Sequence, residues 1–363
     1  LVVKVIRELL RRNPAVSREM VEENGWGATV QEGDQGLTLG RTTALLAGLS
    51  ESCAGFSIDR MCAGGLTAVT TAASEIALGA CDIAIAGGVE HMSHHPIGAT
   101  ADPNPRFVAE RLVSEDALAM GKTAENLHDL FPEITREMAD AYALQSQKKA
   151  AQACSQGLIQ KMIVPMTVYT KKGWVVADHD QQPRPDTSME GLRDIKAPFR
   201  AQGRVTAGNS SGLNDGACGV LLMSEERARD LGVVPKMRLV GYAYAGVRPE
   251  IMGYGPIPAT RKLFARTGLT MEDMGFIELN EAFAVQCLVF MKEFGLAMPE
   301  DGRLNPLGGA ISFGHPLAAS GPRLIMHLMH LFAMRPDVRY GLSTLCVGLG
   351  QGGAAIWENL AGS

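Results

Sequence analysis

The most constraining feature of the sequence is the stretch of residues 56–92, in which strand, helix and strand patterns follow one another. A short apolar run precedes Cys62, and small and apolar residues then predict a helix that ends at Gly79. Residues 82–86 predict a buried strand closed by two glycines. This order of elements indicates an α/β protein with layered sheets.

Cys62 lies where the predicted helix begins. The free N–H groups and the dipole at a helix N-terminus favour a thiolate, so this position predicts a lowered pKa for the thiol. Gly64 and Gly65 leave room for a ligand to approach the backbone. Taken alone, the residue is equally compatible with a small buried cysteine that packs a helix onto a sheet.

A similar arrangement recurs in the second half of the chain. Residues 276–279 predict a strand that leads into Asn280, and His315 opens a long predicted helix. The strand that follows ends at Cys346, which we expect in a glycine-rich turn. Similarity at a period near half the chain implies duplicated α/β units. A pseudo-twofold axis between them would bring Cys62 and His315 to one cleft.

Changes in composition along the chain predict three parts. Residues 95–213 contain recurring prolines, more charge and few strand patterns, apart from an amphipathic helix over 136–156. We expect an inserted, loop-rich domain there, of the kind that often carries ligand-binding residues. Residues 1–94 and 214–235 then form the N-terminal half of the core, and residues 236–363 form the C-terminal half.

The overall composition is that of a globular protein. The chain has 363 residues, enough for two or three domains, and its net charge of -5 gives no reason to expect a nucleic acid. No apolar run is long enough to span a membrane, and no signal peptide is visible. Because the sequence opens at Leu1 within a predicted helix, we expect a leading segment, with any targeting peptide, to be missing.

The chain has seven widely spaced cysteines and no C-x-x-C pair. This usage favours a reducing compartment over a disulfide framework or a zinc cluster.

Three further residues are candidates for chemistry beside Cys62. His315, between a glycine and a proline, is alone more typical of a structural histidine, but near a cysteine it becomes a base for the thiol proton. Cys346 is a redox partner, an inert core residue, or an acid–base group for a carbon acid. Asn280, at a strand end, is suited to hold a water or to donate to an oxyanion.

At this point four motifs, in this order, resemble the active-site motifs of the thiolases, and the similarity covers essentially the whole chain. The motifs are Met61-Cys62-Ala63-Gly64-Gly65, Asn280-Glu281-Ala282-Phe283, Gly314-His315-Pro316 and Cys346-Val347-Gly348. The resemblance implies a duplicated, five-layer α-β-α-β-α fold with an inserted loop domain, and an acyltransferase activity.

The resemblance also implies a role for each of five residues. Cys62 becomes acylated, His315 activates it, and Cys346 moves a proton at the α-carbon of acetyl-CoA. His315 and a water held by Asn280 would stabilise the thioester enolate, while the N–H groups of Cys62 and Gly348 would bind the oxyanion formed at the acyl-enzyme. The implied reaction is the cleavage of a 3-ketoacyl-CoA by CoA to acetyl-CoA and a shortened acyl-CoA, as in fatty-acid β-oxidation.

The family's ligands and partners follow from the same resemblance. No metal and no permanently bound cofactor is implied, since the thioester supplies the activation, and coenzyme A is substrate and product. The family also implies a homodimer or homotetramer, allows a hydratase–dehydrogenase partner subunit, and is cytoplasmic in bacteria but mitochondrial or peroxisomal in eukaryotes. CoA would lie against the inserted loop domain, with contacts implied by position from Arg184, Phe199, Ala207 and Ser211, and with Met120 and Phe283 beside the acyl chain.

Several positions depart from the family pattern and bear on the substrate. Ala119 stands where many acetoacetyl-CoA thiolases have a histidine, and residues 251–256 are closer to the degradative thiolases. Gly64 replaces the commoner serine, and Ala318 replaces the usual glycine, which leaves the substrate length open. We therefore expect a degradative 3-ketoacyl-CoA thiolase.

Three alternatives remain. A ketoacyl-synthase-like condensing enzyme would have a histidine in place of Cys346. A biosynthetic acetoacetyl-CoA thiolase would share every catalytic residue and differ only in its pocket and direction. A non-catalytic, lipid-binding relative would be expected to have lost Cys62, His315 or Cys346, and the presence of all three disfavours it.

Two other residue groups are interpreted as structural. His91, His94 and His95 form a run with metal-like spacing, but we identify no accompanying acidic residue or cysteine, and similar family sequences hold no metal. The remaining cysteines are interpreted as small buried hydrophobic residues: Cys53, Cys81, Cys154, Cys218 and Cys287.

Overall fold

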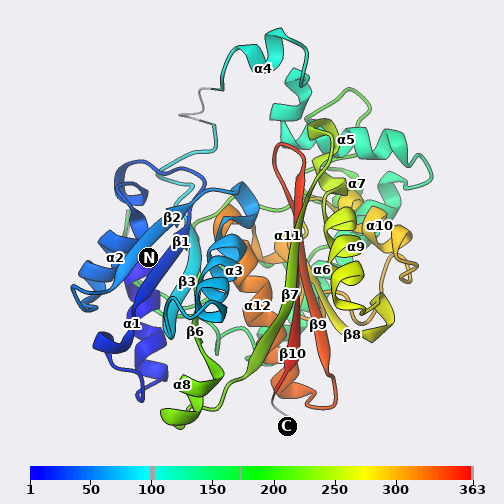
Figure 1. Cartoon of the computed structure of the whole chain (residues 1–363). Coiled ribbons are helices and arrows are strands. Elements are labelled where there is room, and N and C mark those ends of the chain that lie inside the picture. The colour runs from blue at the N-terminus through cyan, green and yellow to red at the C-terminus, as the bar shows by residue number, and fades with distance from the viewer. Residues whose placement is uncertain (99–102, 172, 361–363) are drawn as a thin grey trace.

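Two four-stranded sheets, with helices between and outside them, form the body of the molecule (Figure 1). The computed structural model describes residues 1–98, 103–171 and 173–360. Within these ranges no helix is both long and apolar enough to span a bilayer.

The first sheet has the strand order β2-β1-β3-β6, in which β6 alone is antiparallel to its neighbour. The second has the order β7-β10-β9-β8, in which β8 and β9 are parallel and the other pairs antiparallel. A separate hairpin, β4-β5, completes the strands. The strands are β1 (Glu23–Gly27), β2 (Ala54–Ile58), β3 (Ile83–Glu90), β4 (Met166–Thr170), β5 (Gly173–Ala177), β6 (Gly216–Met223), β7 (Met237–Gly246), β8 (Met274–Leu279), β9 (Tyr340–Val347) and β10 (Gln351–Asn359).

The helices of the described residues include six short 3-10 turns. The α-helices are α1 (Val2–Arg12), α2 (Leu39–Ala47), α3 (Gly64–Ala77), α4 (Arg106–Ala109), α5 (Met120–Leu130), α6 (Arg136–Ser155), α7 (Met189–Arg193), α8 (Glu225–Asp230), α9 (Pro256–Thr267), α10 (Ala284–Glu293), α11 (Ala310–Phe313) and α12 (Leu317–Met334). The 3-10 turns are η1 (Arg18–Met20), η2 (Gly33–Gln35), η3 (Met61–Ala63), η4 (Glu115–Leu118), η5 (Pro249–Tyr254) and η6 (Met271–Asp273).

Helices α3 and α12 form the central layer of the fold. They pack against each other, α3 contacts β1 and β3, and α12 contacts β3, β8 and β9. Helices α1 and α2 contact the first sheet, and α9 contacts the second, so helices cover the outer faces as well (Figure 1). The predicted five-layer α-β-α-β-α architecture is confirmed.

The central layer is close-packed because glycines let backbones meet. A Cβ added to Gly65 or Gly88 would lie 2.2 Å or 2.1 Å from the carbonyl oxygen of Ala318 on α12. The prediction that two glycines close the strand after Cys62 is wrong, since Gly87 and Gly88 lie inside β3. They are there because α12 and β6 approach the strand more closely than any side chain would allow.

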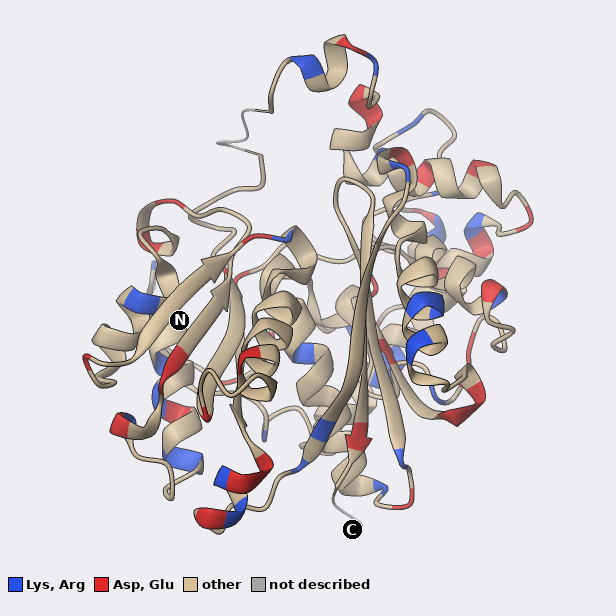
Figure 2. Cartoon of the chain, viewed as in Figure 1, with Lys and Arg blue, Asp and Glu red and all other residues tan. Residues whose placement is uncertain are grey.

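The apolar core follows the layers. One buried cluster lies around α3 and α12, a second lies around α1, α2 and the first sheet with Trp26 fully buried, and a third joins the second sheet to α5, α6, α9 and α10. Figure 2 shows that charged residues are sparse on the strands and central helices and lie mostly at their ends and in the loops.

Between β3 and β6 the chain leaves the two sheets. The described part of this segment contains short helices, the hairpin β4-β5 and the long helix α6, which matches the predicted helix over 136–156. The Thr135 hydroxyl accepts a hydrogen bond from the N–H of Met138 and caps α6 at its start. The α6 helix packs against α10 and α11, and so reaches the second sheet's side of the molecule.

Candidate active site

Cys62 lies in the 3-10 turn η3, between the end of β2 and the start of α3. The residue before it, Met61, has a φ of 45°, a left-handed value that is uncommon for a side chain of this size, and its N–H donates to Asp59 at 2.7 Å. The η3 turn packs against both α12 and β9. The elements that carry Cys62, His315 and Cys346 therefore meet, as the repeat in the sequence predicts.

The lowered pKa predicted for Cys62 is wrong. The N–H groups of Gly348 and of Cys62 itself do favour the thiolate, but burial outweighs them and raises the pKa of Cys62 to about 12. The thiol stays partly accessible to solvent. Helix dipoles act mainly on groups in the first turn, whereas Cys62 lies two residues before the first residue of α3 and is largely enclosed by protein. The free thiol is therefore the resting form, and a base must remove its proton.

Cys346 lies near Cys62 but not in the expected turn. It is fully buried within strand β9, and the glycine-rich turn begins only after Val347. Burial, with the neighbouring Cys62 as a second cause, raises the pKa of the Cys346 thiol. Its Sγ makes a weak contact with the Gln286 carboxamide oxygen at 3.8 Å. A strand places this sulfur more rigidly than a turn would.

His315 is held in place from two sides. Its Nδ1 lies 2.5 Å from the Ser320 hydroxyl, one turn into α12, so Nε2 is the nitrogen left for chemistry. The Asn280 side-chain nitrogen lies 3.3 Å from Nε2 and 3.4 Å from Nδ1. Burial lowers the pKa of His315 to about 3, with Arg323 as a second cause, so the imidazole is neutral in the free protein.

Arg323 fixes the orientation of the Asn280 side chain. Its guanidinium donates to the Gly314 carbonyl at 2.6 Å and to the Asn280 side-chain oxygen at 3.4 Å. Because the oxygen of the carboxamide faces a cation, its NH₂ group must face His315. Gly314 itself has a φ of 85°, and a Cβ there would lie 2.3 Å from the Asn214 side chain, so only glycine fits before His315.

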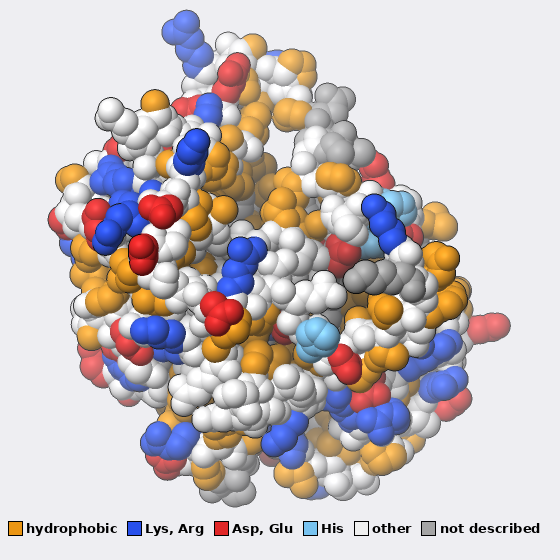
Figure 3. Space-filling view, turned by 180° about the vertical axis from the view of Figure 1, so that it is seen from behind, with side chains coloured by type: hydrophobic (Ala, Val, Ile, Leu, Met, Phe, Trp, Pro, Cys, Tyr) orange, Lys and Arg blue, Asp and Glu red, His pale blue; other side chains and the backbone are white. Residues whose placement is uncertain are grey.

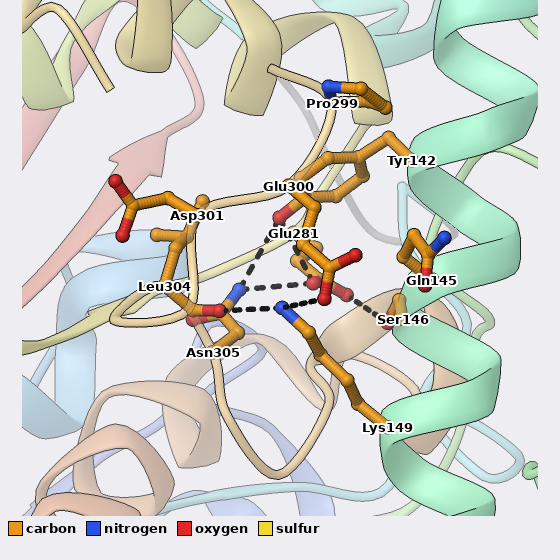
Figure 4. A pocket seen from close by; sticks show the side chains of 10 residues that line it. All are labelled: Tyr142, Gln145, Ser146, Lys149, Glu281, Pro299, Glu300, Asp301, Leu304 and Asn305. Carbon is orange, nitrogen blue, oxygen red and sulfur yellow. Dashed lines mark hydrogen bonds and ion pairs between the residues drawn. The ribbon is translucent and has the colours of Figure 1, made fainter. Parts of the chain in front are cut away.

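A buried polar network anchors the backbone of this motif (Figure 4). The Glu281 carboxylate accepts hydrogen bonds from Tyr142, Ser146, Asn305 and the N–H of Ile311, at 3.0, 2.7, 2.9 and 3.1 Å. Figure 4 shows these side chains converging on Glu281 from α6 and from the loop before α11, beside a small cavity. The network ties the segment after β8 to α6 and so fixes Asn280.

Gly348 lies between two methionines at the same site. A Cβ there would be 2.6 Å from the Met61 sulfur and 3.6 Å from the Met120 sulfur. Gly121, the residue after Met120, lies against the ring of Phe199, since a Cβ added to Gly121 would be 2.4 Å from that ring. Met120 thus lies beside Gly348, and Phe199 lies against the residue that follows Met120, although the three are distant in the sequence.

The other expected CoA contacts lie on the inserted segment and next to the Asn280 motif. Ser211 donates its N–H to the Ala282 carbonyl at 3.0 Å, and the residue before it pairs with Phe283. Arg184 and Ala207 are exposed. Figure 3 shows a hollow on the back face with hydrophobic side chains on its walls.

Two sequence interpretations concern residues outside this site. All seven cysteines are free, but Cys154 and Cys218 are only partly buried, so the expectation of burial fails for those two. The statement that no acidic residue accompanies the histidine run is also wrong, because the fold places Asp34 within contact distance of His91, His94 and His95.

Four features of the site were not predicted from the sequence: Ser320, Arg323, Gln286 and the network around Glu281. Ser320 and Arg323 follow His315 by five and eight residues, so the helix predicted to begin there could have placed them near it. Gln286 and the network depend on contacts between elements far apart in the chain and gave no signal in the sequence.

Comparisons with known proteins agree with this geometry. Two family models match the chain: the thiolase N-terminal domain over residues 1–226 and the thiolase C-terminal domain over residues 233–359. A 3-oxoadipyl-CoA/3-oxo-5,6-dehydrosuberyl-CoA thiolase of Escherichia coli is 44% identical, over 98% of this chain and 92% of its own. A 3-ketoacyl-CoA thiolase of Pseudoalteromonas translucida is 41% identical, over 98% and 91%.

A solved structure is similar over nearly the whole chain. The crystal structure of the Bacillus anthracis acetyl-CoA acetyltransferase has a TM-score of 0.87 at 38% identity, covering 98% of this chain and 91% of that one. With both family models matched and relatives above 40% identity over almost the full length, the chain belongs to the thiolase family of acyltransferases.

Proposed function

We propose that this protein catalyses the thiolytic cleavage of a 3-ketoacyl-CoA by CoA, giving acetyl-CoA and an acyl-CoA shortened by two carbons. The observation that carries the proposal is the convergence at Gly348. Its N–H group favours the thiolate form of Cys62, Cys346 lies two residues before it, and two methionines enclose it. Relatives named 3-ketoacyl-CoA thiolase support the same reaction.

In the first half of the reaction, neutral His315 accepts the Cys62 proton and the sulfur attacks the 3-keto carbon of the substrate. The N–H groups of Cys62 and Gly348 stabilise the oxyanion that forms there. The bond between C2 and C3 then breaks, leaving the shortened acyl group on Cys62. The departing acetyl-CoA enolate takes a proton from the Cys346 thiol, while His315 and a water on Asn280 stabilise its oxygen.

In the second half, a CoA thiol replaces acetyl-CoA. It gives its proton to the Cys346 thiolate, attacks the acyl-enzyme and releases the Cys62 thiolate, which regains its proton from His315. All protons return to their starting groups, and no electrons are gained or lost. The reaction therefore needs no resident metal or redox cofactor.

The raised thiol pKa values fit this cycle. A thiol with a high pKa forms a strong nucleophile once its proton is removed. The thiolate of such a group is also a good acceptor for the proton of a CoA thiol. The largely buried setting that raises these pKa values also limits the access of bulk water, which would otherwise hydrolyse the acyl-enzyme.

For binding, we propose that CoA lies along the inserted segment, with Arg184 exposed to meet a phosphate and Phe199 to meet an apolar part of the cofactor. Ala207 and Ser211 would contact the pantetheine arm, and Met120 and Phe283 the acyl chain. Association into a homodimer or homotetramer, and with a hydratase–dehydrogenase partner, are further parts of this proposal.

We propose the degradative direction over the biosynthetic one because the position before Met120 holds Ala119 and the wall around Gly348 is apolar. A dicarboxylic substrate is a second candidate, since the relative at 44% identity is named for 3-oxoadipyl-CoA. These candidates differ only in the acyl chain.

The test is CoA-dependent loss of the enolate absorbance with three substrates side by side: acetoacetyl-CoA, a long-chain 3-ketoacyl-CoA and 3-oxoadipyl-CoA. Cys62→Ala should abolish turnover, and Cys154→Ala, a matched cysteine at the end of α6, should not change it. The highest kcat/KM with the long chain supports the proposal. A preference for acetoacetyl-CoA favours the biosynthetic class, and a preference for 3-oxoadipyl-CoA favours the second candidate. Absence of cleavage of all three substrates overturns the activity.

A further inference from the structure

A cluster of three histidines and one aspartate lies outside the proposed catalytic site. His91 follows directly after β3, and residues 92–94 form a turn in which the N–H groups of His94 and His95 both donate to the His91 carbonyl, at 3.1 and 2.7 Å. This turn places the imidazoles on one side of the backbone. There they meet Asp34, which lies in η2 and is 57 residues away from His91 in the chain.

The distances within the cluster suit a small cation. The Asp34 carboxylate oxygens lie 3.4 Å from Nδ1 of His91 and 3.3 Å from Nδ1 of His94. Candidate ligand atoms of these three residues all lie within 4.8 Å of one another. Zinc binds imidazole nitrogen and carboxylate oxygen at about 2.0–2.2 Å, so neighbouring ligand atoms in a tetrahedral site are about 3.4 Å apart. Each of the two spacings is close to that edge, with Oδ2 of Asp34 facing His91 and Oδ1 facing His94.

Further contacts would hold the three ligands in place. His95 Nε2 lies 2.5 Å from Asp34 Oδ1 and so fixes the carboxylate from the side away from His91. The other ring nitrogen of His91 faces the Asp215 carboxylate at 3.8 Å, and the Ser93 N–H and hydroxyl hold that carboxylate at 2.8 and 2.6 Å. Outer carboxylates that face the second nitrogen of a ligating histidine are typical of zinc sites.

We propose that His91, His94 and Asp34 form a binding site for a divalent transition-metal cation of the zinc class, with a water at the fourth position. Two nitrogen ligands favour Zn²⁺, Co²⁺ or Ni²⁺ over Mg²⁺ and Ca²⁺, which prefer oxygen. The site is open to solvent, since the side chains of His94 and Asp34 are 62% and 57% exposed. It can therefore load from solution without opening the fold.

The cation would add a link between two segments that already touch through the His95–Asp34 contact and through the hydrogen bond from the His91 N–H to the Gln35 side chain, at 2.6 Å. One is the loop that holds η2, and the other is the start of the inserted segment after β3. Binding to the folded state alone raises the stability of the protein as the metal concentration rises.

The experiment uses the full-length chain after treatment with a chelator. Co²⁺ titration, followed by absorbance and calorimetry, should show one equivalent with the d–d bands of a tetrahedral nitrogen–oxygen site and no thiolate-to-cobalt charge-transfer band. Such a band would indicate binding at one of the free cysteines, Cys62 included. Zn²⁺ at the same stoichiometry should raise the melting temperature.

Three variants decide where the metal binds. His94→Ala and Asp34→Asn, both at exposed positions, should each weaken Co²⁺ binding at least tenfold and remove the Zn²⁺-dependent rise in melting temperature. His179→Ala is the matched control, because His179 is an exposed histidine that pairs with an adjacent aspartate at 2.8 Å, and it should bind Co²⁺ as the parent chain does. Absence of a bound equivalent in the parent chain, or equal binding by all three variants, overturns the proposal.

Discussion

Gly64 and Ala318, two positions at which this chain departs from the thiolase pattern, lie against each other in the central layer. A Cβ on Gly64 would be 3.2 Å from the Ala318 methyl, tighter than an ordinary contact, and the next nearest atoms are 3.5 and 3.7 Å away. Ala318 is fully buried. The methyl group that Ala318 adds thus fills the space that a side chain at residue 64 would use.

We predict that restoring the family residues one at a time is costly and that restoring both is not. Gly64→Ser should gain about 0.5 kcal/mol of helix propensity but cost 1–3 kcal/mol in overpacking, a net loss of about 1 kcal/mol. Ala318→Gly should lose about 1 kcal/mol of propensity and about 0.8 kcal/mol for one buried methyl, about 2 kcal/mol in all. In the double variant the serine occupies the vacated space, so we expect a cost of about 1 kcal/mol in place of the additive 3, a coupling of about 2 kcal/mol.

The assay is urea unfolding followed by the fluorescence of the buried Trp26 and Trp357, compared among variants with equal m-values. Gly302→Ser is the control, because a Cβ at Gly302 meets nothing within 4 Å, and its effect should add to that of Ala318→Gly. If the effects of Gly64→Ser and Ala318→Gly add to within about 0.5 kcal/mol, the two residues do not compensate and the reasoning is refuted.

Four further predictions concern the site. Because the pKa of Cys62 is raised to about 12, alkylation of the free enzyme by iodoacetamide should accelerate about tenfold per pH unit from pH 7 to 10, and a plateau below pH 9 would contradict this. Arg323→Lys should lower kcat about 10–100-fold with a smaller change in KM, since an ammonium cannot keep both guanidinium contacts; an unchanged kcat would argue against a positioning role. Ser320→Ala should cost about 1–2 kcal/mol in kcat/KM by releasing Nδ1 of His315, with Ser320→Cys partly restoring it. Glu281→Gln should destabilise the fold by about 2–4 kcal/mol, measured by thermal unfolding, because the NH₂ group that replaces one carboxylate oxygen would face the two donors bound to that oxygen.

Most of the secondary structure was predicted from the sequence, because the spacing of apolar residues distinguishes helices from strands and turn residues mark where the elements end. Strand β8, helix α6 and the strand–helix–strand unit around Cys62 agree with the expected residues to within a few positions. Two predictions near the site are wrong for different reasons. The glycines of β3 were predicted to end the strand, but they lie within it because the backbones of β6 and α12 approach closely, which a linear pattern does not show. Cys346 was predicted in the glycine-rich turn, but β9 continues to Val347 and the turn begins after it.

The balance between opposing effects on the pKa of Cys62 was harder to predict than the position of the residue. The position of Cys62 next to a helix start was identified correctly, but the direction of its pKa shift was not, because burial by η3, β9 and α12 depends on the complete fold. The contact of Asp34 with the histidine run was missed for the same reason, because it depends on the complete fold and no local pattern connects the two. The family motifs, by contrast, predicted the fold class and the acyltransferase family, which are confirmed.

The pairing of β6 with β3 has a consequence for how the chain folds during its synthesis. Strand β3 is buried along its whole length, yet its antiparallel partner comes only after residues 91–215 have been made. At 5–20 residues per second, the ribosome needs about 6 to 25 s for that stretch. Throughout this interval an apolar strand edge stays open to pairing with other chains. Nascent chains of this protein are therefore expected to depend on chaperones until β6 emerges.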